Sequence, residues 1–142
     1  MTESEALSKF GLVPDASSLE EIRREIAAET AFRRADGYDE NDYEDYTPVL
    51  YLFCVQLFAA RQVQDCLFIW RAKQCDFDAF CMVDSEFLCG AGLEETQTFL
   101  REQNSEEARK ILDFIDQYGS FHRSDWSHEG HLDIYRRYYG LL

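Results

Sequence analysis

Hydrophobic residues recur at helical spacing along most of the chain, whereas the strict alternation typical of strands is nearly absent. Leu19, Ile22 and Ile26 form one apolar stripe, from which Arg23 faces outward. Residues 48–61 are apolar almost all round, which is typical of a central, buried helix. The whole pattern predicts helices over residues 19–34, 48–61, 64–73, 77–88, 93–103, 106–118 and 128–139, and one or two helical turns over residues 3–10.

Residue types at the ends of these segments act as start and stop signals. Ser18 and Glu21 have the spacing of a capping box, in which each side chain bonds the other's backbone amide. Thr47 and Pro48 predict that a helix begins at Pro48, because proline is favoured at the first helical position. Further N-caps are predicted at Asp76 and Ser105, and a tight turn with close helix approach at residues 90–92.

The short connections and the lack of strands predict an all-α fold, with one domain over residues 1–142 and six or seven helices. Residues 1–17 form a weak lead-in, and residues 36–47 form an acidic loop. Helix starts recur near residues 48, 76 and 106, a spacing that a short stack of antiparallel helical hairpins would give. A compact helical bundle fits the pattern equally well, so both architectures stay open.

Composition and charge narrow the class of partner. The 142 residues include 28 Asp and Glu against 14 Lys and Arg, a net charge of −14 at pH 7. Phosphate binding relies on Lys and Arg, so no nucleic-acid partner is expected. The longest apolar stretch, residues 49–60, is shorter than the about 20 residues that cross a bilayer, and the acidic N-terminus lacks the basic start of a signal peptide. Five cysteines without a CxxC pair favour reduced thiols and a cytoplasmic location.

A distinctive run of residues lies between positions 66 and 100. It consists of Ile69-Trp70-Arg71-Ala72-Lys73, Phe77-Asp78, Asp84, Leu88-Cys89-Gly90-Ala91-Gly92-Leu93-Glu94-Glu95-Thr96 and Phe99-Leu100. In this run the chain resembles small, all-helical, uncharacterised bacterial proteins, some of which resemble immunity proteins of polymorphic toxin systems. The resemblance implies neutralisation of a cognate toxin without catalysis, and it implies no particular binding residues.

Two carboxylates of this run, Asp78 and Asp84, lie six residues apart on one predicted helix, so they do not share a face. A buried and unpaired charge is costly, so either carboxylate, if buried, is expected to pair with Arg71 or Lys73. This interpretation makes both residues structural. A functional role is the alternative, because perturbed carboxylates also occur at functional sites.

Residues 36–46 are the first candidate for a binding site, with six acids, three tyrosines and no base. Carboxylate clusters steer towards positive surfaces, such as the phosphate-binding cleft of a nuclease toxin, and tyrosine is enriched at binding hot spots. We expect a basic protein partner, in the concrete case a toxin domain, to be bound by Tyr38, Asp39, Asp42, Tyr43, Glu44, Asp45 and Tyr46. A solvated loop without a partner is the alternative, and the spacing of the acids does not fit an EF-hand calcium loop.

The histidines support a second hypothesis, a small metal-dependent or cysteine enzyme built on residues His122 to Asp133. His128 and His131 are three residues apart where a zinc-protease helix has four, so a metal would also need His122 or Asp125. A thiol nucleophile needs a nearby base, yet the cysteines lie mid-chain and the histidines near its end. The immunity protein, with no cofactor, therefore remains the first hypothesis. A non-catalytic helical scaffold or dimerisation module is a third, because the sequence leaves the oligomeric state open.

Overall fold

The computed structural model describes residues 1–35 and 43–142, and for residues 43–47 it gives the course of the backbone. Over this part of the chain it is helical without any strand, which confirms the predicted all-α class. The eight α-helices of the described residues are α1 (Glu3–Phe10), α2 (Leu19–Arg34), α3 (Tyr43–Ala60), α4 (Cys66–Lys73), α5 (Phe77–Met82), α6 (Leu93–Gln103), α7 (Glu106–Gln117) and α8 (His128–Tyr138). Short 3-10 helices lie at η1 (Ala16–Ser18), η3 (Val63–Asp65), η4 (Ser85–Cys89) and η5 (Ser120–His122).

Helix α3 forms the centre of the core and packs against α1, α2, α4, α5, α8 and η4. All of its residues from 52 to 59 are buried, as the nearly all-round apolar pattern predicts. The polar residue in this run, Gln56, donates from its amide nitrogen to the backbone oxygens of Ala6 at 3.3 Å and Gly11 at 2.8 Å. These bonds fix the end of α1 against α3, because a buried amide is stable only when it is hydrogen-bonded.

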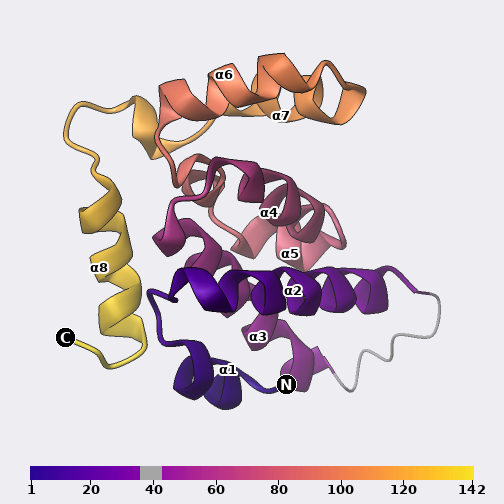
Figure 1. Cartoon of the computed structure of the whole chain (residues 1–142), viewed down its shortest axis with the longest axis vertical. Helices are drawn as coiled ribbons and strands as arrows, with labels where there is room; N and C mark the ends of the chain where they lie inside the picture. The colour runs from indigo at the N-terminus through magenta and orange to yellow at the C-terminus, as the bar shows by residue number, and fades with distance from the viewer. Residues whose placement is uncertain (36–42) are drawn as a thin grey trace.

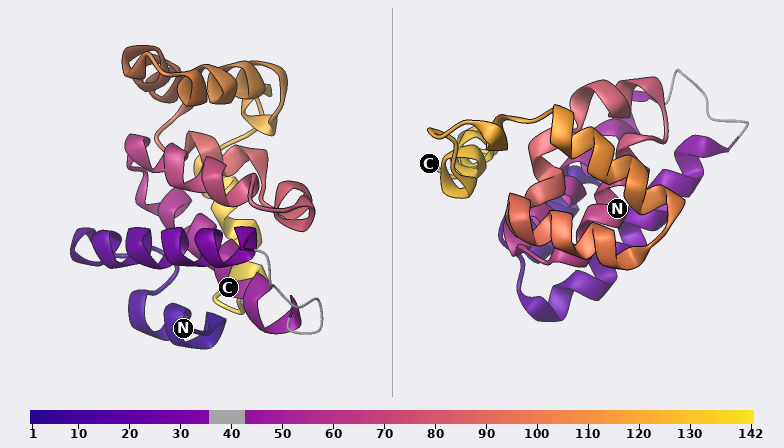
Figure 2. Two further views of the ribbon diagram at one scale, coloured as in Figure 1. Left: turned by 90° about the vertical axis from the view of Figure 1, so that its right-hand side faces the viewer. Right: turned by 90° about the horizontal axis from the view of Figure 1, so that it is seen from above.

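The helices follow one another along the long axis of the molecule. Helix α1 lies at one end and the α6–α7 hairpin at the other, with α2, α4 and α5 between them (Figure 1). Helix α8 leaves this stack and runs along its side (Figure 2). One continuous core still includes residues of every α-helix listed above, from Ala6 in α1 to Leu132 in α8. A helical bundle with one core therefore fits the structure. No helix among the described residues is long and apolar enough to cross a membrane.

The predicted lead-in contains a full helix, so the described residues hold eight α-helices where the pattern predicts six or seven. The side chain of Thr2 accepts a hydrogen bond from the Glu5 amide at 3.2 Å and caps α1. Gly11, with φ 70°, ends the helix. Ala6 and Phe10 are buried, and this packing stabilises a helix that is too short to form alone.

The predicted helix over residues 77–88 is interrupted. Asp76 caps its start as expected, with Oδ1 accepting from the Ala79 amide at 2.7 Å. Helix α5 then ends at Met82, because extended backbone at Val83 and Asp84 leads into η4. The prediction that Asp78 and Asp84 share one helix is therefore wrong.

The start of α3 also corrects a prediction, because the helix begins at Tyr43 and Pro48 lies inside it. The pattern places a loop up to residue 47 and the helix start at Pro48. The carboxylates of Glu44 and Asp45 favour a helix N-terminus through the helix dipole. Pro48 removes one backbone hydrogen bond near the start of the helix, which the long buried segment that follows outweighs.

Helix α2 begins at the predicted residue but without a capping box. The backbone of Ser18 is already helical, with φ −91° and ψ −15°, and its side chain makes no capping hydrogen bond. Arg23, which the pattern places outward, donates to both carboxylate oxygens of Asp65, at 2.6 and 3.0 Å. Asp65 is completely buried, so this ion pair ties α2 to η3.

Besides the cap at Asp76, two more of the predicted local features are confirmed. The side chain of Ser105 accepts from the Ala108 amide at 3.1 Å and caps α7. At the turn of residues 90–92, a Cβ on Gly90 would lie 2.8 Å from the backbone oxygen of Phe58, and Gly92 has φ 108°. Only glycine allows both the close approach and this backbone conformation.

Candidate functional site

The acidic segment expected to bind a partner falls largely outside the described residues. Tyr38, Asp39 and Asp42 lie in the stretch that the structure does not describe. The backbone of residues 43–46 belongs to the start of α3, and the side chains of Tyr43, Glu44, Asp45 and Tyr46 are outside the description. Their role in binding stays a prediction.

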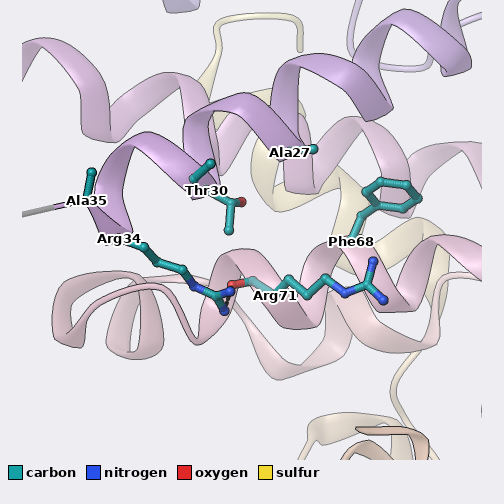
Figure 3. A pocket seen from close by; sticks show the side chains of 7 residues that line it. Ala27, Thr30, Arg34, Ala35, Phe68 and Arg71 are labelled. Atoms are coloured by element: carbon teal, nitrogen blue, oxygen red, sulfur yellow. Dashed lines mark hydrogen bonds between the residues drawn. The ribbon is translucent and has the colours of Figure 1, made fainter. Parts of the chain in front are cut away.

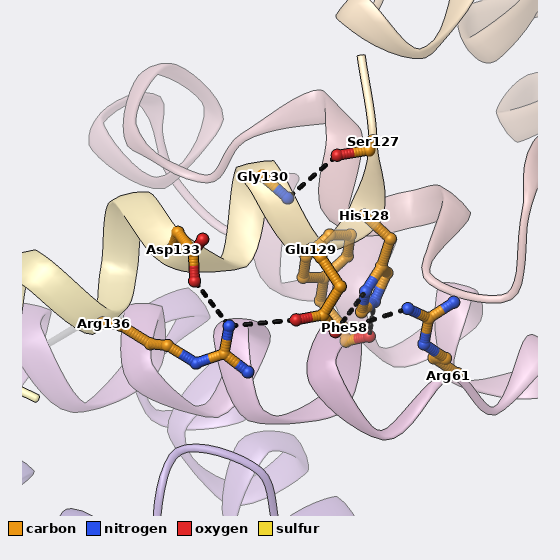
Figure 4. Close-up of polar contacts among 8 residues, drawn as sticks. All are labelled: Phe58, Arg61, Ser127, His128, Glu129, Gly130, Asp133 and Arg136. Carbon is orange, nitrogen blue, oxygen red and sulfur yellow. Dashed lines mark hydrogen bonds and ion pairs between the residues drawn. The ribbon is translucent and has the colours of Figure 1, made fainter. Parts of the chain in front are cut away.

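The three histidines, which the second hypothesis places at one metal site, each bond a different group of the protein. His122 bonds the backbone oxygen of Ile115 at 2.6 Å. His128 donates from Nε2 to the backbone oxygen of Phe58 at 2.9 Å and stacks on the Phe58 ring at 4.2 Å between centroids (Figure 4). Among residues 1–35 and 43–142, no group of three His, Cys, Asp or Glu side chains is arranged to hold a metal ion. The histidines instead join helices together.

His131 belongs to a polar cluster that holds α8. Its Nδ1 accepts from the indole nitrogen of Trp126 at 3.2 Å, so Nε2 carries the proton and donates to Asp84 at 2.9 Å. The hydroxyl of Tyr135 donates to the same Asp84 oxygen, Oδ2, at 2.5 Å. Asp84 is thus paired as expected, but with side chains of α8 rather than with Arg71 or Lys73. Asp78 is exposed and needs no partner.

The five cysteines are free, and the burial of Cys54, Cys66 and Cys89 does not suit a thiolate nucleophile. Burial raises the pKa of Cys66 and Cys89 to about 12 and raises that of Cys54 further. Burial also raises the pKa of Cys75. Cys81 is exposed. The buried thiols therefore act as small apolar side chains, as their apolar sequence context predicts.

One hollow combines a large volume with exposed aromatic side chains, and we call it the aromatic groove. It lies between α5 and α7, has a volume of about 660 Å³ and is lined by Lys73, Phe80, Cys81, Val83, Asp84, Ser85, Glu86, Phe114 and Tyr118. Phe114 is at its centre, with ring centroids 5.0 Å from Tyr118, 5.4 Å from Trp70 and 6.5 Å from Phe80. Most pairs are edge-on or tilted, the stable geometry for aromatic rings.

Side chains around the aromatic groove are exposed to an extent that is unusual for their type. Two of its lining residues, Tyr118 and Phe80, are 55% and 44% exposed. On α5, the helix that carries Phe80, Phe77 is 78% exposed and Met82 is 58% exposed. Single exposed apolar residues are common on proteins, but a group of them with large rings marks an interaction surface. These four side chains do not belong to the hydrophobic core.

The floor of the aromatic groove is the buried amine of Lys73. Its Nζ donates to the backbone oxygens of Phe80, at 2.6 Å, and of Val83, and so satisfies carbonyls at the end of α5. Nζ also lies 5.0 Å from the centre of the Phe80 ring and 5.9 Å from that of Phe114. Burial lowers the pKa of Lys73, and the charge of Asp84 opposes this effect. These bonds make Lys73 a structural residue, although a desolvated lysine in a cleft can also be reactive.

The charges that a ligand would meet in the aromatic groove are negative. Asp84 and Glu86 line it, and Asp78 is exposed on α5 beside it. The bonds from His131 and Tyr135 to Asp84 both end on Oδ2. The Lys73 amine is directed to backbone oxygens of the protein itself. The aromatic groove therefore offers ring faces and carboxylates, which suits the apolar stems and positive heads of Lys and Arg side chains.

A second hollow, between α2 and α4, has the opposite charge. It has a volume of about 480 Å³ and is lined by Ala27, Thr30, Ala31, Arg34, Ala35, Phe68 and Arg71 (Figure 3). Arg71 forms a bidentate pair with Glu107 at 2.8 and 3.1 Å, and Arg34 donates to the backbone oxygen of Arg71 at 3.3 Å. Both arginines already bind within the protein, so this hollow has a structural explanation.

The sequence pattern places Phe77 and Phe80 on the helix predicted over residues 77–88 but does not identify the aromatic groove. One signal was available: Phe77 stands between Asp76 and Asp78, and an apolar residue between two acids at a helix start is poorly placed for burial. Comparison with known proteins supplies no further signal. The chain matches no protein-family model, no curated protein and no solved structure.

Proposed function

We propose that this chain is an acidic, non-enzymatic protein-binding protein, in the concrete case an immunity protein that neutralises a toxin by covering a basic surface of it. The observation that carries the proposal is the aromatic groove, where exposed Phe80 and Tyr118 lie beside carboxylates, with exposed Phe77 on the same helix as Phe80. Aromatic anchors supply most of the binding energy in protein interfaces, and flanking charges select the partner.

Charge supports a basic partner rather than a second copy of the chain. The net charge of −14 makes two copies repel each other and accelerates association with a positive protein. Six of the acids that give this charge lie within residues 36–46, and we propose this segment as a second contact with the same partner. The aromatic groove would then supply affinity, and the acidic segment would supply steering.

The test uses the protein encoded by the neighbouring gene as the partner, because toxins and their immunity proteins are paired. Its affinity for the chain is measured by biolayer interferometry at low and at physiological salt. The Phe77→Ser and Phe80→Ser variants are expected to weaken binding about tenfold or more each. Val13→Ser, at a side chain that is 52% exposed and lies outside the aromatic groove, is the matched control and should leave binding unchanged.

The acidic segment is tested separately by reversing the charges of Asp39, Asp42, Glu44 and Asp45 to Lys. We expect a slower association rate and a weaker salt dependence, because steering acts on the rate of encounter. Unchanged affinity and rate would remove this segment from the binding site. If the neighbouring gene product does not bind, or binds all groove variants equally, the immunity proposal is wrong. A dimer that sediments as such and dissociates in Phe77→Ser would instead favour a dimerisation module.

A further inference from the structure

A separate hollow, which we call the tyrosine pocket, lies beside the C-terminal half of α8. It has a volume of about 340 Å³, and its walls come from α1, α3, α5, η4 and α8. No residue lines both this pocket and the aromatic groove. The volume falls within the range of small-molecule sites, and aromatic side chains dominate the lining.

The aromatic rings of the tyrosine pocket meet at steep angles, so that faces as well as edges surround the space. The rings of Tyr138 and Tyr139 are perpendicular, with centroids 4.9 Å apart. Phe87 and Tyr135 lie 5.2 Å apart at 59°. Ring faces carry a partial negative charge, and several of them around one space attract a cation.

The charge that lines the tyrosine pocket is negative. Among the described residues that line it, Glu3 is the only charged one. The Tyr135 hydroxyl donates to the Asp84 carboxylate, which pushes electron density into the Tyr135 ring and strengthens its attraction for a cation. Burial and the negative charge of Glu3 both raise the pKa of Tyr139, so this tyrosine stays a neutral ring. The guanidinium of Arg33 lies 5.9 Å from the Tyr51 ring, but Arg33 is buried and does not line the pocket.

We propose that the tyrosine pocket binds an alkylammonium group, a positive head on an apolar stem, with Tyr138 and Tyr139 against the head and Glu3 as its counter-charge. Met82 and Ile134, which are 58% and 54% exposed, supply apolar contact for the stem. The group has two sources with the same chemistry: a free small molecule, or the side chain of a lysine in a bound peptide. This inference does not depend on the aromatic groove or on the immunity function.

The probes are choline and its uncharged isostere 3,3-dimethylbutan-1-ol, titrated into the full chain and followed by isothermal calorimetry and by NMR shifts of the tyrosine rings. Choline should bind about tenfold or more tightly than the alcohol, because only the charge differs. A blocked Gly-Lys-Gly peptide forms the second arm. Choline binding alone assigns the site to a small molecule, and binding of the peptide alone assigns it to a lysine side chain. Binding of neither, or equal binding of choline and the alcohol, overturns the proposal.

Two variants locate the bound cation, and each has a matched control. Glu3→Gln should weaken choline binding several-fold, whereas Glu5→Gln, in the same helix turn but exposed and outside the pocket, should not. Tyr138→Leu keeps the bulk but removes a ring face, and Tyr138 is 72% exposed, so folding is preserved. Tyr118→Leu removes a comparably exposed tyrosine from the aromatic groove and should have no effect. If both controls weaken choline binding as much as the pocket variants, the site is not the tyrosine pocket.

Discussion

Helices α3 and α8 pack against each other but are held in the molecule by different interactions. Helix α3 buries an unbroken apolar run, whereas among α8 residues only His128 and Leu132 are buried. The other contacts of α8 with the rest of the molecule are partly buried rings, such as Tyr135 against Phe87, and polar bonds, which join His131 and Tyr135 to Asp84 and Glu129 to Arg61 (Figure 4). The bonds of Arg136 to Glu129 and Asp133 lie within α8 itself. Apolar burial is cumulative and non-directional, whereas each hydrogen bond adds about 1 kcal/mol and needs its geometry.

This difference bears on function because the two proposed binding surfaces depend on different helices. The aromatic groove is built from α4, α5, η4 and α7 and does not include α8. Four lining residues of the tyrosine pocket, residues 134, 135, 138 and 139, lie on or directly after α8. We therefore expect α8 to open at a lower free energy than α3, and to take the tyrosine pocket with it.

The largest expected effect is the loss of a core ring on α3. Phe53→Ala should lower the free energy of unfolding by about 3–5 kcal/mol, because Phe53 is completely buried and its removal leaves a cavity. Urea unfolding followed by far-ultraviolet circular dichroism measures the change. The control, Phe77→Ala, removes the same ring from a position that is 78% exposed and should change stability by less than about 0.5 kcal/mol. A comparable loss in both variants would mean that Phe77 belongs to the core and not to a binding surface.

The next effect should be confined to α8. Asp84→Ala removes the shared acceptor of His131 and Tyr135 and should destabilise the protein by about 1–3 kcal/mol. Hydrogen exchange followed by mass spectrometry should show that amides of α8 exchange faster while those of α3 keep their protection. Asp78→Ala, at an exposed carboxylate on α5, serves as the control. Equal loss of protection in α3 and α8 would show that the two helices unfold as one unit, against the contrast drawn above.

A smaller effect is expected at the serine that begins α8. The Ser127 side chain accepts from the Gly130 amide at 3.0 Å, so Ser127→Ala should cost about 1 kcal/mol. Ser18→Ala is the matched control, because Ser18 precedes α2 but makes no capping bond. Thermal melts of the two variants measure the difference. A larger loss of thermal stability in Ser18→Ala than in Ser127→Ala would show that Ser18 does cap α2, as the sequence predicts.

The ends of the helices show which parts of the fold can be predicted from sequence. Caps at Asp76 and Ser105 and the turn at Gly90 follow from local chemistry and are confirmed. The N-cap predicted at Ser18 is wrong because Ser18 already belongs to the 3-10 helix η1. The helix start predicted at Pro48 is wrong because α3 begins at Tyr43, although proline is favoured at the first helical position. Such failures arise where two local signals compete and the packing of a neighbouring element decides between them.

The candidate sites were harder to predict because both bring together residues from distant segments. Periodicity places Phe80 and Phe114 on two separate helices. It does not show that the short helix α5 leaves the Phe80 ring partly exposed, or that α7 brings Phe114 to the same groove. Glu3 and Tyr138 are 135 residues apart and meet in the tyrosine pocket only through the placement of α8. The pairing of Asp84 could be predicted from the cost of an unpaired charge, but its partners on α8 could not.

The smallest effect is a pH dependence of stability that arises where His128 of α8 contacts Phe58 of α3. Burial lowers the pKa of His128, so the unfolded chain binds the proton more readily than the folded one. The free energy of unfolding is therefore unaffected at pH values above the histidine pKa of the unfolded chain, about 6.5, and decreases as the pH falls below it. The backbone oxygen of Phe58 and the charge of Glu129 favour the protonated form, whereas Arg61 and His131 oppose it.

His128→Gln isolates this contribution, because glutamine keeps a donor for the Phe58 oxygen and has no proton to gain. Urea midpoints between pH 7.5 and 5 should fall more steeply for the native chain than for His128→Gln. Glu29, whose pKa is raised by burial, contributes with the opposite sign, but it is present in both proteins and cancels in the difference. Hydrogen exchange at pH 5.5 should place the loss in α8. If the curves of the native chain and His128→Gln run parallel, the junction of α3 and α8 does not titrate, and the weaker attachment of α8 rests on Asp84 and its partners alone.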